Sequence, residues 1–130
     1  MMKTIFKPGD VKVYNKKVTV DDTASFHGVV LHPVYATFAL ARDFEWSSRL
    51  FFLEMKEDDE EGVGTFLQIE HHSPAKIGEE VTISATAESI TGNELICIIE
   101  ARSGDRIIAT GKTGQKMLKK EKLIKLFGHG

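Results

Sequence analysis

Cysteine, charge of one sign and long apolar runs are all scarce in this sequence of 130 residues. Cys97 is the only cysteine, which excludes a disulfide framework and a thiolate metal cluster. The formal net charge is −2, which does not suggest a nucleic-acid partner. No apolar run approaches the ~20 residues that span a bilayer, and the first residues lack the apolar core of a signal peptide. We therefore expect a cytoplasmic protein with one domain, residues 1–130.

Several catalytic signatures are also absent. The sequence has no P-loop, no dinucleotide-binding glycine fingerprint and no G-x-S-x-G nucleophile motif. Neither an H-x-x-x-H nor a C-x-x-C spacing occurs, so we expect no metal site. These absences favour chemistry that needs neither a metal nor a redox cofactor.

Alternation of apolar and polar residues predicts a first strand over residues 11–20, followed by a loop over 21–28. A charged turn is expected at 56–62, and the C-terminal segment 119–127 reads as a short amphipathic helix. Four more strands follow the charged turn, and short turn signals separate the last three, which indicates an antiparallel meander. These strands are expected at 63–71, 80–90, 94–103 and 106–118.

Between the first strand and the charged turn, the pattern is helical from Pro33 to about Met55. On a helical wheel this segment is apolar or small almost all the way round, so we expect it to be buried. One small sheet cannot cover such a helix, and the segment 95–99 is apolar on both faces. The pattern therefore predicts an α+β fold with one long helix against an antiparallel sheet, assembled as a homodimer or a larger homo-oligomer.

Glu45 is an unexpected carboxylate within the apolar stripe of this helix. A structural role is an ion pair with Arg49, four residues later, or with Arg42, three residues earlier. The alternative is that a carboxyl group in an apolar site performs acid–base or nucleophilic chemistry. The helix alone leaves both open.

His71 ends the strand expected at 63–71, which also contains Gly64. Strict alternation places Thr65, Leu67 and His71 on the helix-facing side, and Gly64 on the opposite side. A histidine that ends an apolar row is either a satisfied core residue or a catalyst. A glycine inside a strand indicates a bulge or a close approach by a ligand.

Four segments together resemble the fluoroacetyl-CoA thioesterase family of hotdog-fold proteins. They are VYAT (34–37), FEW (44–46), GVGT (62–65) and IEHHSPAKIG (69–78). The similarity runs without a gap from about Val34 to Gly78 and continues more loosely over the later strands. The resemblance implies the hotdog fold, in which a five-stranded antiparallel sheet wraps around one long central helix and which usually dimerises.

In that family a threonine near the helix start, a glutamate eight residues on and a histidine ending the next strand form the catalytic set. These positions correspond to Thr37, Glu45 and His71 here. Two positions differ from the family. Leu31 stands where a bulky aromatic is usual, and GKTGQ (111–115) replaces a G-x-H-x-R pattern, with Thr113 and Gln115 at the His and Arg positions.

The resemblance implies hydrolysis of an acyl-CoA thioester with a short or medium acyl group. Glu45 would attack the carbonyl or activate a water, and His71 would act as general acid and base. Thr37 would orient the carboxylate. The substrate would be bound by Leu31, Val34, Phe38 and backbone N–H groups near Gly64.

Two other functions are compatible with the same fold. A non-catalytic hotdog module would bind acyl-CoA or a related ligand, with Glu45 only paired to Arg49. A hotdog hydratase is disfavoured because the sequence has no G-D-x-N-P-x-H stretch.

Overall fold

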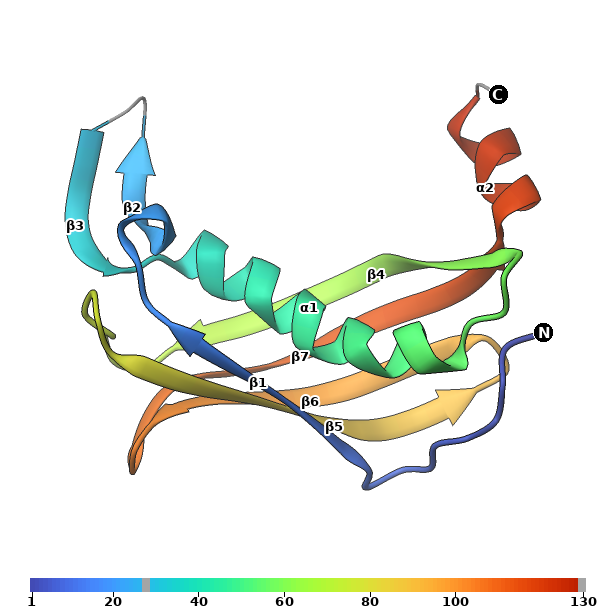
Figure 1. Cartoon of the computed structure of the whole chain (residues 1–130), viewed down its shortest axis with the longest axis horizontal. Coiled ribbons are helices and arrows are strands. Elements are labelled where there is room, and N and C mark those ends of the chain that lie inside the picture. The colour runs from blue at the N-terminus through green and yellow to red at the C-terminus, as the bar shows by residue number, and fades with distance from the viewer. Residues whose placement is uncertain (27–28, 129–130) are drawn as a thin grey trace.

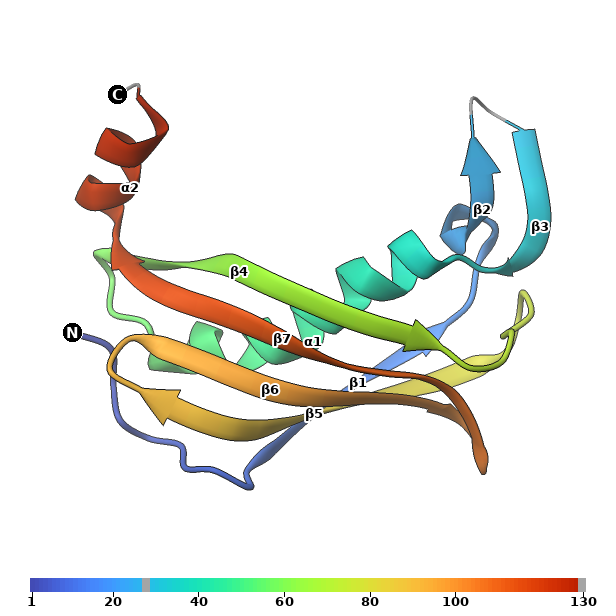
Figure 2. The ribbon, with the colours of Figure 1, turned by 180° about the vertical axis from the view of Figure 1, so that it is seen from behind.

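The computed structural model describes residues 1–26 and 29–128, so that His27 and His129 lie outside the described residues. One long helix, α1, lies across one face of a curved sheet, in front of it in Figure 1 and behind it in Figure 2. The elements in chain order are β1 (Val11–Lys17), η1 (Val20–Asp22), β2 (Thr23–Phe26), β3 (Val29–Tyr35), α1 (Thr37–Met55), β4 (Glu60–His71), β5 (Glu80–Thr91), β6 (Glu94–Ser103), β7 (Arg106–Lys119) and α2 (Lys120–Phe127).

The main sheet has the strand order β1-β5-β6-β7-β4, and every neighbouring pair is antiparallel. The predicted turns join β5 to β6 and β6 to β7. Gly92 and Gly104 occupy them with φ of 62° and 59°, a left-handed conformation that suits glycine in tight hairpins. The predicted α+β arrangement of one long helix on a five-stranded antiparallel sheet is confirmed.

The core lies between α1 and the inner face of the sheet. Each large apolar side chain that is fully buried there contributes roughly 1.5–3 kcal/mol of transfer free energy. The largest of them are Tyr35, Phe44, Phe51, Phe52, Leu40, Met55, Ile83, Leu95, Ile99 and Ile108. Because half of these side chains belong to α1 and the others to strands, the helix is held in a defined position over the sheet.

Two predictions about the segment before the helix are wrong. Residues 23–26 and Pro33 belong to a separate two-stranded sheet formed by β2 and β3, not to a loop and a helix. The register of this sheet jumps from Tyr35 to His32, so Pro33 lies at an irregularity where its missing N–H removes no ladder bond. α1 begins four residues later than predicted, at Thr37.

In the single chain α1 is buried on one side only, as expected if one small sheet cannot cover the helix by itself. Phe38 and Trp46 are 51% and 40% exposed, and Glu45 is exposed as well. The sheet covers only one side of α1, because β4 is its last strand and the described part of the chain adds no further strand beside it.

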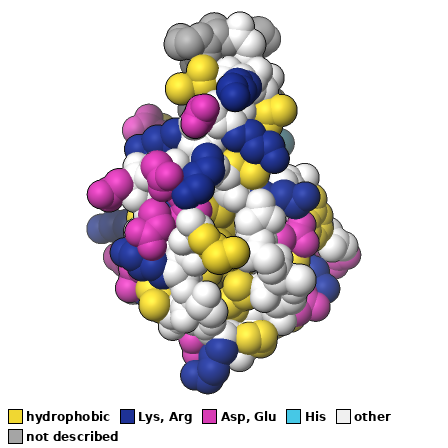
Figure 3. Space-filling model, turned by 90° about the vertical axis from the view of Figure 1, so that its right-hand side faces the viewer, with side chains coloured by type: hydrophobic (Ala, Val, Ile, Leu, Met, Phe, Trp, Pro, Cys, Tyr) yellow, Lys and Arg dark blue, Asp and Glu magenta, His cyan; other side chains and the backbone are white. Residues whose placement is uncertain are grey.

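Within the described residues no helix is long and apolar enough to cross a membrane. At the end of the molecule that carries α2, basic and acidic side chains lie interspersed with apolar ones (Figure 3).

Candidate active site

Thr37 and His71 lie together at one end of the helix. Thr37 is the first residue of α1 and His71 the last residue of β4. The Thr37 Oγ1 atom lies 3.2 Å from the Nδ1 atom of His71, within hydrogen-bond distance. Both side chains are exposed in the single chain. The pairing holds the imidazole at the helix start with one ring nitrogen in use and leaves Nε2 directed elsewhere.

Glu45 lies further along the helix, directly above Gly64. A Cβ atom added to Gly64 would come within 2.8 Å of the Glu45 Oε1 atom. The absent side chain of Gly64 therefore makes the space that the carboxylate occupies. This is the close approach that a glycine in a strand indicates, although the group that approaches is a side chain of the same protein.

The prediction that Gly64 and His71 lie on opposite faces of β4 is wrong. The register of β4 against β7 shifts between Gly64 and Phe66, so that Thr65 is an extra, bulged residue. A bulge changes the alternation of side chains on the two sides of a strand. Gly64 and His71 both face the helix as a result.

The Glu45 carboxylate borders an open pocket of about 210 Å³. The pocket is lined by Arg42, Glu45, Trp46, Arg49, Gly64 and Gln115. Thr37 and His71 are not among these lining residues. Within one chain the structure thus brings together Thr37 with His71, and Glu45 with Gly64, as two separate pairs.

The ion pairs considered for Glu45 do not form. Arg49 forms an ion pair with Glu61 and donates a 3.3 Å hydrogen bond to the carbonyl of Gly62. Arg42 binds two aspartates instead. Across the described residues, no hydrogen bond or ion pair reaches the Glu45 carboxylate, which is therefore not held by a structural charge pair.

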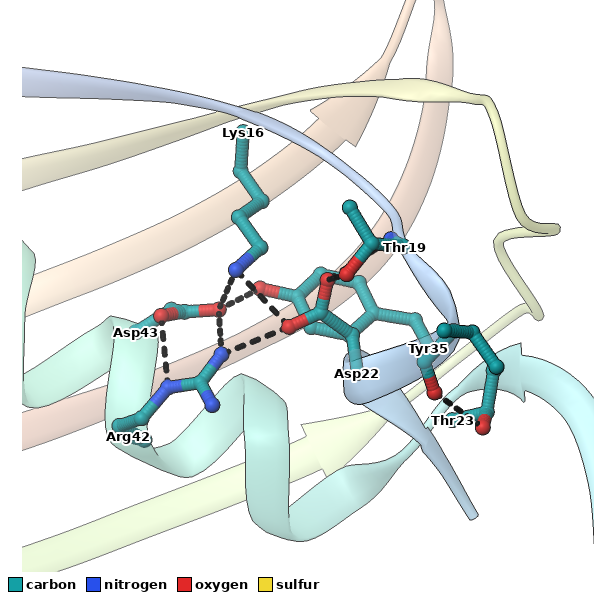
Figure 4. A network of polar contacts seen from close by, with 8 residues as sticks. Lys16, Thr19, Asp22, Thr23, Tyr35, Arg42 and Asp43 are labelled. Carbon is teal, nitrogen blue, oxygen red and sulfur yellow. Dashed lines mark hydrogen bonds and ion pairs between the residues drawn. The ribbon is translucent and has the colours of Figure 1, made fainter. Parts of the chain in front are cut away.

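A buried polar network near the helix start was missed by the sequence analysis (Figure 4). Asp43 of α1 is 3% exposed and accepts hydrogen bonds from Arg42 and from the hydroxyl of Tyr35. Asp22 of η1 is 1% exposed and pairs with the same guanidinium and with Lys16 of β1, each at 2.8 Å. The only sequence signal was an aspartate on the predicted buried helix, two residues from Glu45.

The network ties η1, β1 and β3 to the start of α1. The backbone N–H of Ala36, the residue before the helix, also donates to the Asp22 carbonyl at 2.8 Å. Burial opposes ionisation of Asp22, but hydrogen bonds from Lys16, the Thr19 backbone and Arg42 outweigh it and lower its pKa to about 2. Burial and the hydrogen bond to Asp43 raise the pKa of Tyr35, which therefore remains a donor.

The remaining predicted site residues lie near the Thr37 end of the helix. Leu31 and Val34 are in β3, and Phe38 follows Thr37 in α1. Leu31 is 56% exposed and Val34 half-buried, so neither forms a closed acyl pocket in the single chain. His72 is engaged with the Thr110 hydroxyl at 2.8 Å.

Two further groups lack the environment of a reactive site. Cys97 is buried in β6, and burial raises the pKa of its thiol to about 12, so it is not a reactive thiolate. In the part of the chain that the structure describes, no three His, Cys, Asp or Glu side chains are grouped as ligands for a metal ion.

Comparison with known proteins relates this geometry to one family. Residues 18–121 match the family described as fluoroacetyl-CoA-specific thioesterase, FlK. A Thermus thermophilus protein described as a thioesterase superfamily member superposes with a TM-score of 0.87 and 32% identity, over 93% of this chain and 90% of that one. No protein of curated function matches the sequence significantly.

Two more distant structures share the fold. A variant of the fluoroacetyl-CoA-specific thioesterase FlK, in complex with fluoroacetate and CoA, has a TM-score of 0.83 and 22% identity, over 91% of this chain and 99% of that one. A hot-dog-like protein from Thermanaerovibrio acidaminovorans has a TM-score of 0.85 and 21% identity, over 94% and 90% of the two chains. Because the family match covers most of its length, the chain belongs to the fluoroacetyl-CoA-specific thioesterase family and is an acyl-CoA thioesterase with the hotdog fold.

Proposed function

We propose that this protein hydrolyses the CoA thioester of a short or medium acyl group, with Glu45, His71 and Thr37 as its catalytic set. The observation that carries the proposal is the state of Glu45. Its carboxylate has no partner among the described residues, lies over the backbone of Gly64 and borders an open pocket. A carboxylate kept free in this way is available to a substrate or to a water molecule.

The catalytic set cannot assemble within one chain. Thr37 and Glu45 are eight residues apart on α1, about 12 Å along the axis at a rise of about 1.5 Å per residue. Gly64 and His71 are seven residues apart on β4, about 23 Å at a rise of about 3.3 Å per residue. Glu45 and His71 of the same chain are therefore too far apart to act on one carbonyl carbon.

A homodimer that pairs the free edge of β4 with the β4 of a second copy resolves this separation. If the two-fold axis passes between Leu67 and Gln68, antiparallel pairing sets Gly64 opposite the partner's His71. The Glu45 carboxylate above Gly64 then faces the Thr37–His71 pair of the other subunit. Each dimer would contain two such composite sites.

Three features of the surface support this dimer. β4 is an edge strand, and a free edge invites pairing with another chain. Phe66 and Leu67 near its centre are 42% and 38% exposed, and Phe38 and Trp46 of α1, the helix that packs on this sheet, are exposed as well. The β2–β3 hairpin and α2 project on the same side from opposite ends of β4, which leaves space for a second subunit between them (Figures 1 and 2).

In the proposed reaction a water molecule gives a proton to the Glu45 carboxylate as its oxygen bonds to the thioester carbonyl carbon. A backbone N–H at the bulge beside Gly64 stabilises the resulting oxyanion. The carbon–sulfur bond then breaks, and the partner's His71 protonates the leaving thiolate. In the alternative route the carboxylate attacks first and releases the thiolate, and water then hydrolyses the acyl anhydride.

Leu31, Val34 and Phe38 lie around the Thr37 end of this site, and we assign them to the acyl pocket. In the dimer they would be covered by the partner, which closes the pocket around a short or medium chain. We further propose that residues 1–130 form one domain that works in the cytoplasm without a metal or redox cofactor.

A subunit-mixing experiment tests the function and the composite site together. The wild-type protein is first assayed for thiol release with acyl-CoA thioesters of increasing chain length. Glu45→Gln and His71→Asn are then purified separately, unfolded, mixed in equal amounts and refolded. Half of the dimers would be mixed, and one of the two sites in each would have both functional side chains, so about a quarter of wild-type activity should return.

Each outcome has a distinct meaning. Activity that returns on mixing supports the composite site, since a site within one chain would have a defect in every subunit. Two inactive variants that stay inactive after mixing, while refolded wild type recovers, would overturn it. A wild-type protein that binds acyl-CoA but never releases thiol would overturn the catalytic proposal and favour a binding module.

A further inference from the structure

Gln115 is a buried polar residue on the inner face of the sheet, beneath the helix turn that carries Glu45. It lies in β7 and is 4% exposed. In the register of β4 and β7 it is directly opposite Gly64. Two paired residues of the sheet therefore lie under the Glu45 turn of the helix. Gly64 on β4 leaves space for the Glu45 carboxylate, and Gln115 on β7 reaches the Glu45 backbone with its amide.

The Gln115 amide holds the backbone of the Glu45 turn. Its Nε2 group donates to the carbonyl oxygen of Glu45 at 3.1 Å and to Ser48 Oγ at 3.0 Å. The Ser48 hydroxyl donates to the same Glu45 carbonyl at 2.9 Å. Since a carbonyl can only accept, the amide must present its nitrogen to the helix, which fixes its orientation.

The other end of the same amide has no partner. Gln115 Oε1 is buried and makes no hydrogen bond within the described residues. Leaving a buried acceptor unsatisfied costs about as much free energy of folding as the two donated hydrogen bonds contribute. Stability alone therefore does not account for a glutamine at this position, because a protein with an apolar side chain of similar volume there would be about as stable.

We propose that Gln115 is a positioning residue for catalysis: it fixes the backbone at Glu45 so that the carboxylate remains over Gly64. This inference rests on the proposed function of Glu45. The carboxylate occupies the space above Gly64, and the carbonyl of the same residue is bound to the opposite strand. Glu45 is held at its backbone and left free at its reacting group.

The first test replaces Gln115 with leucine, which keeps the volume and removes both amide bonds. We expect kcat to fall by at least about 10-fold, since a shift of about 1 Å in a reacting group can cost about 10²-fold. KM should change by less than about 3-fold, and the melting temperature should stay within a few degrees. A merely structural residue would show the reverse, a lower melting temperature with little change in kcat.

Thr113→Val is the matched control. Thr113 lies two residues away on the same strand and is also buried, with its side chain beside Cys97 of β6, but it does not line the Glu45 pocket. Its replacement should leave kcat within about 2-fold of wild type. Equal losses in the Gln115→Leu and Thr113→Val proteins would overturn the positioning role.

A double-mutant cycle keeps the test decisive. Gln115→Leu should cause little further loss when Glu45 is already glutamine, because both changes act through one group. Losses that add in the double variant would reject the inference, whereas a wild-type protein without thioesterase activity would reject the proposed function itself.

Discussion

Two carboxylates lie two residues apart on α1 and have opposite environments. Asp43 is buried and accepts hydrogen bonds from Tyr35 and Arg42. Glu45 is exposed, and its carboxylate is unpaired within the described residues. Both belong to the same helix, so the difference comes entirely from what the rest of the fold presents to each side of it.

The contrast separates the two uses of a charged group in this protein. An aspartate that is fully paired holds elements together, because removing it would leave its buried partners unsatisfied. A glutamate that has been given space but no partner contributes little to the folded state and keeps its proton-accepting capacity for a ligand. Substitution of each residue should therefore affect a different measured quantity.

The largest expected effect on stability is that of Asp43→Ala. The change leaves Arg42 and the Tyr35 hydroxyl with fewer partners in a buried site, and should reduce the free energy of unfolding by about 3–5 kcal/mol. Glu54→Ala removes an exposed carboxylate of the same helix that pairs with Lys12 of β1, and it should cost at most about 1 kcal/mol. Urea unfolding measures both, and equal losses would remove the contrast.

Glu45→Gln should reduce activity and leave stability almost unchanged, the opposite of Asp43→Ala. The amide keeps the volume and loses the basicity, so kcat/KM should fall by at least ~10²-fold while the melting temperature hardly changes. Arg49→Ala should reduce kcat/KM far less, because Arg49 pairs with Glu61 and not with Glu45. A folded Glu45→Gln protein with near-wild-type turnover on its best acyl-CoA would contradict the role assigned to Glu45.

The buried polar network that contains Asp22 and Asp43 should also determine how stable the protein is at acid pH. The pKa of Asp22 is lowered to about 2 from an ordinary 3.8, so its stabilisation is present above about pH 4 and is lost as the pH falls toward 2. The loss from this group is about 2 kcal/mol. Glu61, whose pKa is also lowered to about 2, titrates in the same window. The difference between wild type and Asp22→Asn in urea unfolding at pH 4 and pH 2 isolates the Asp22 part.

The smallest effect, a modest loss of catalytic rate, is expected from Gly64→Ala. The new Cβ atom would lie 2.8 Å from Glu45 Oε1, so the carboxylate must move. We expect about 10-fold lower kcat with the melting temperature little changed. The same substitution in a Glu45→Gln background should cost much less, since the amide no longer reacts. If the loss is equally large in that background, Gly64 acts by another route.

Much of the fold could be read from local patterns. The strands at 80–91 and 94–103 lie within one residue of their expected ends, because alternation and Gly-containing turns are local signals. The segment before α1 was assigned wrongly, because Pro33 fits both a first helical turn and an irregular strand. Only the pairing of β3 with β2, a contact between separate segments, distinguishes the two.

The sequence by itself determined the five strands of the main sheet, the long helix and the candidate set Thr37, Glu45 and His71, since residue type and spacing are sufficient to recognise the family. Only the tertiary structure decided how these residues are used. A one-residue bulge turns Gly64 toward the helix, Arg49 pairs with Glu61 instead of Glu45, and the carboxylate of α1 that is buried is Asp43. Each of these depends on atoms far apart in the chain, where burial and hydrogen bonding, not local periodicity, set the free energy.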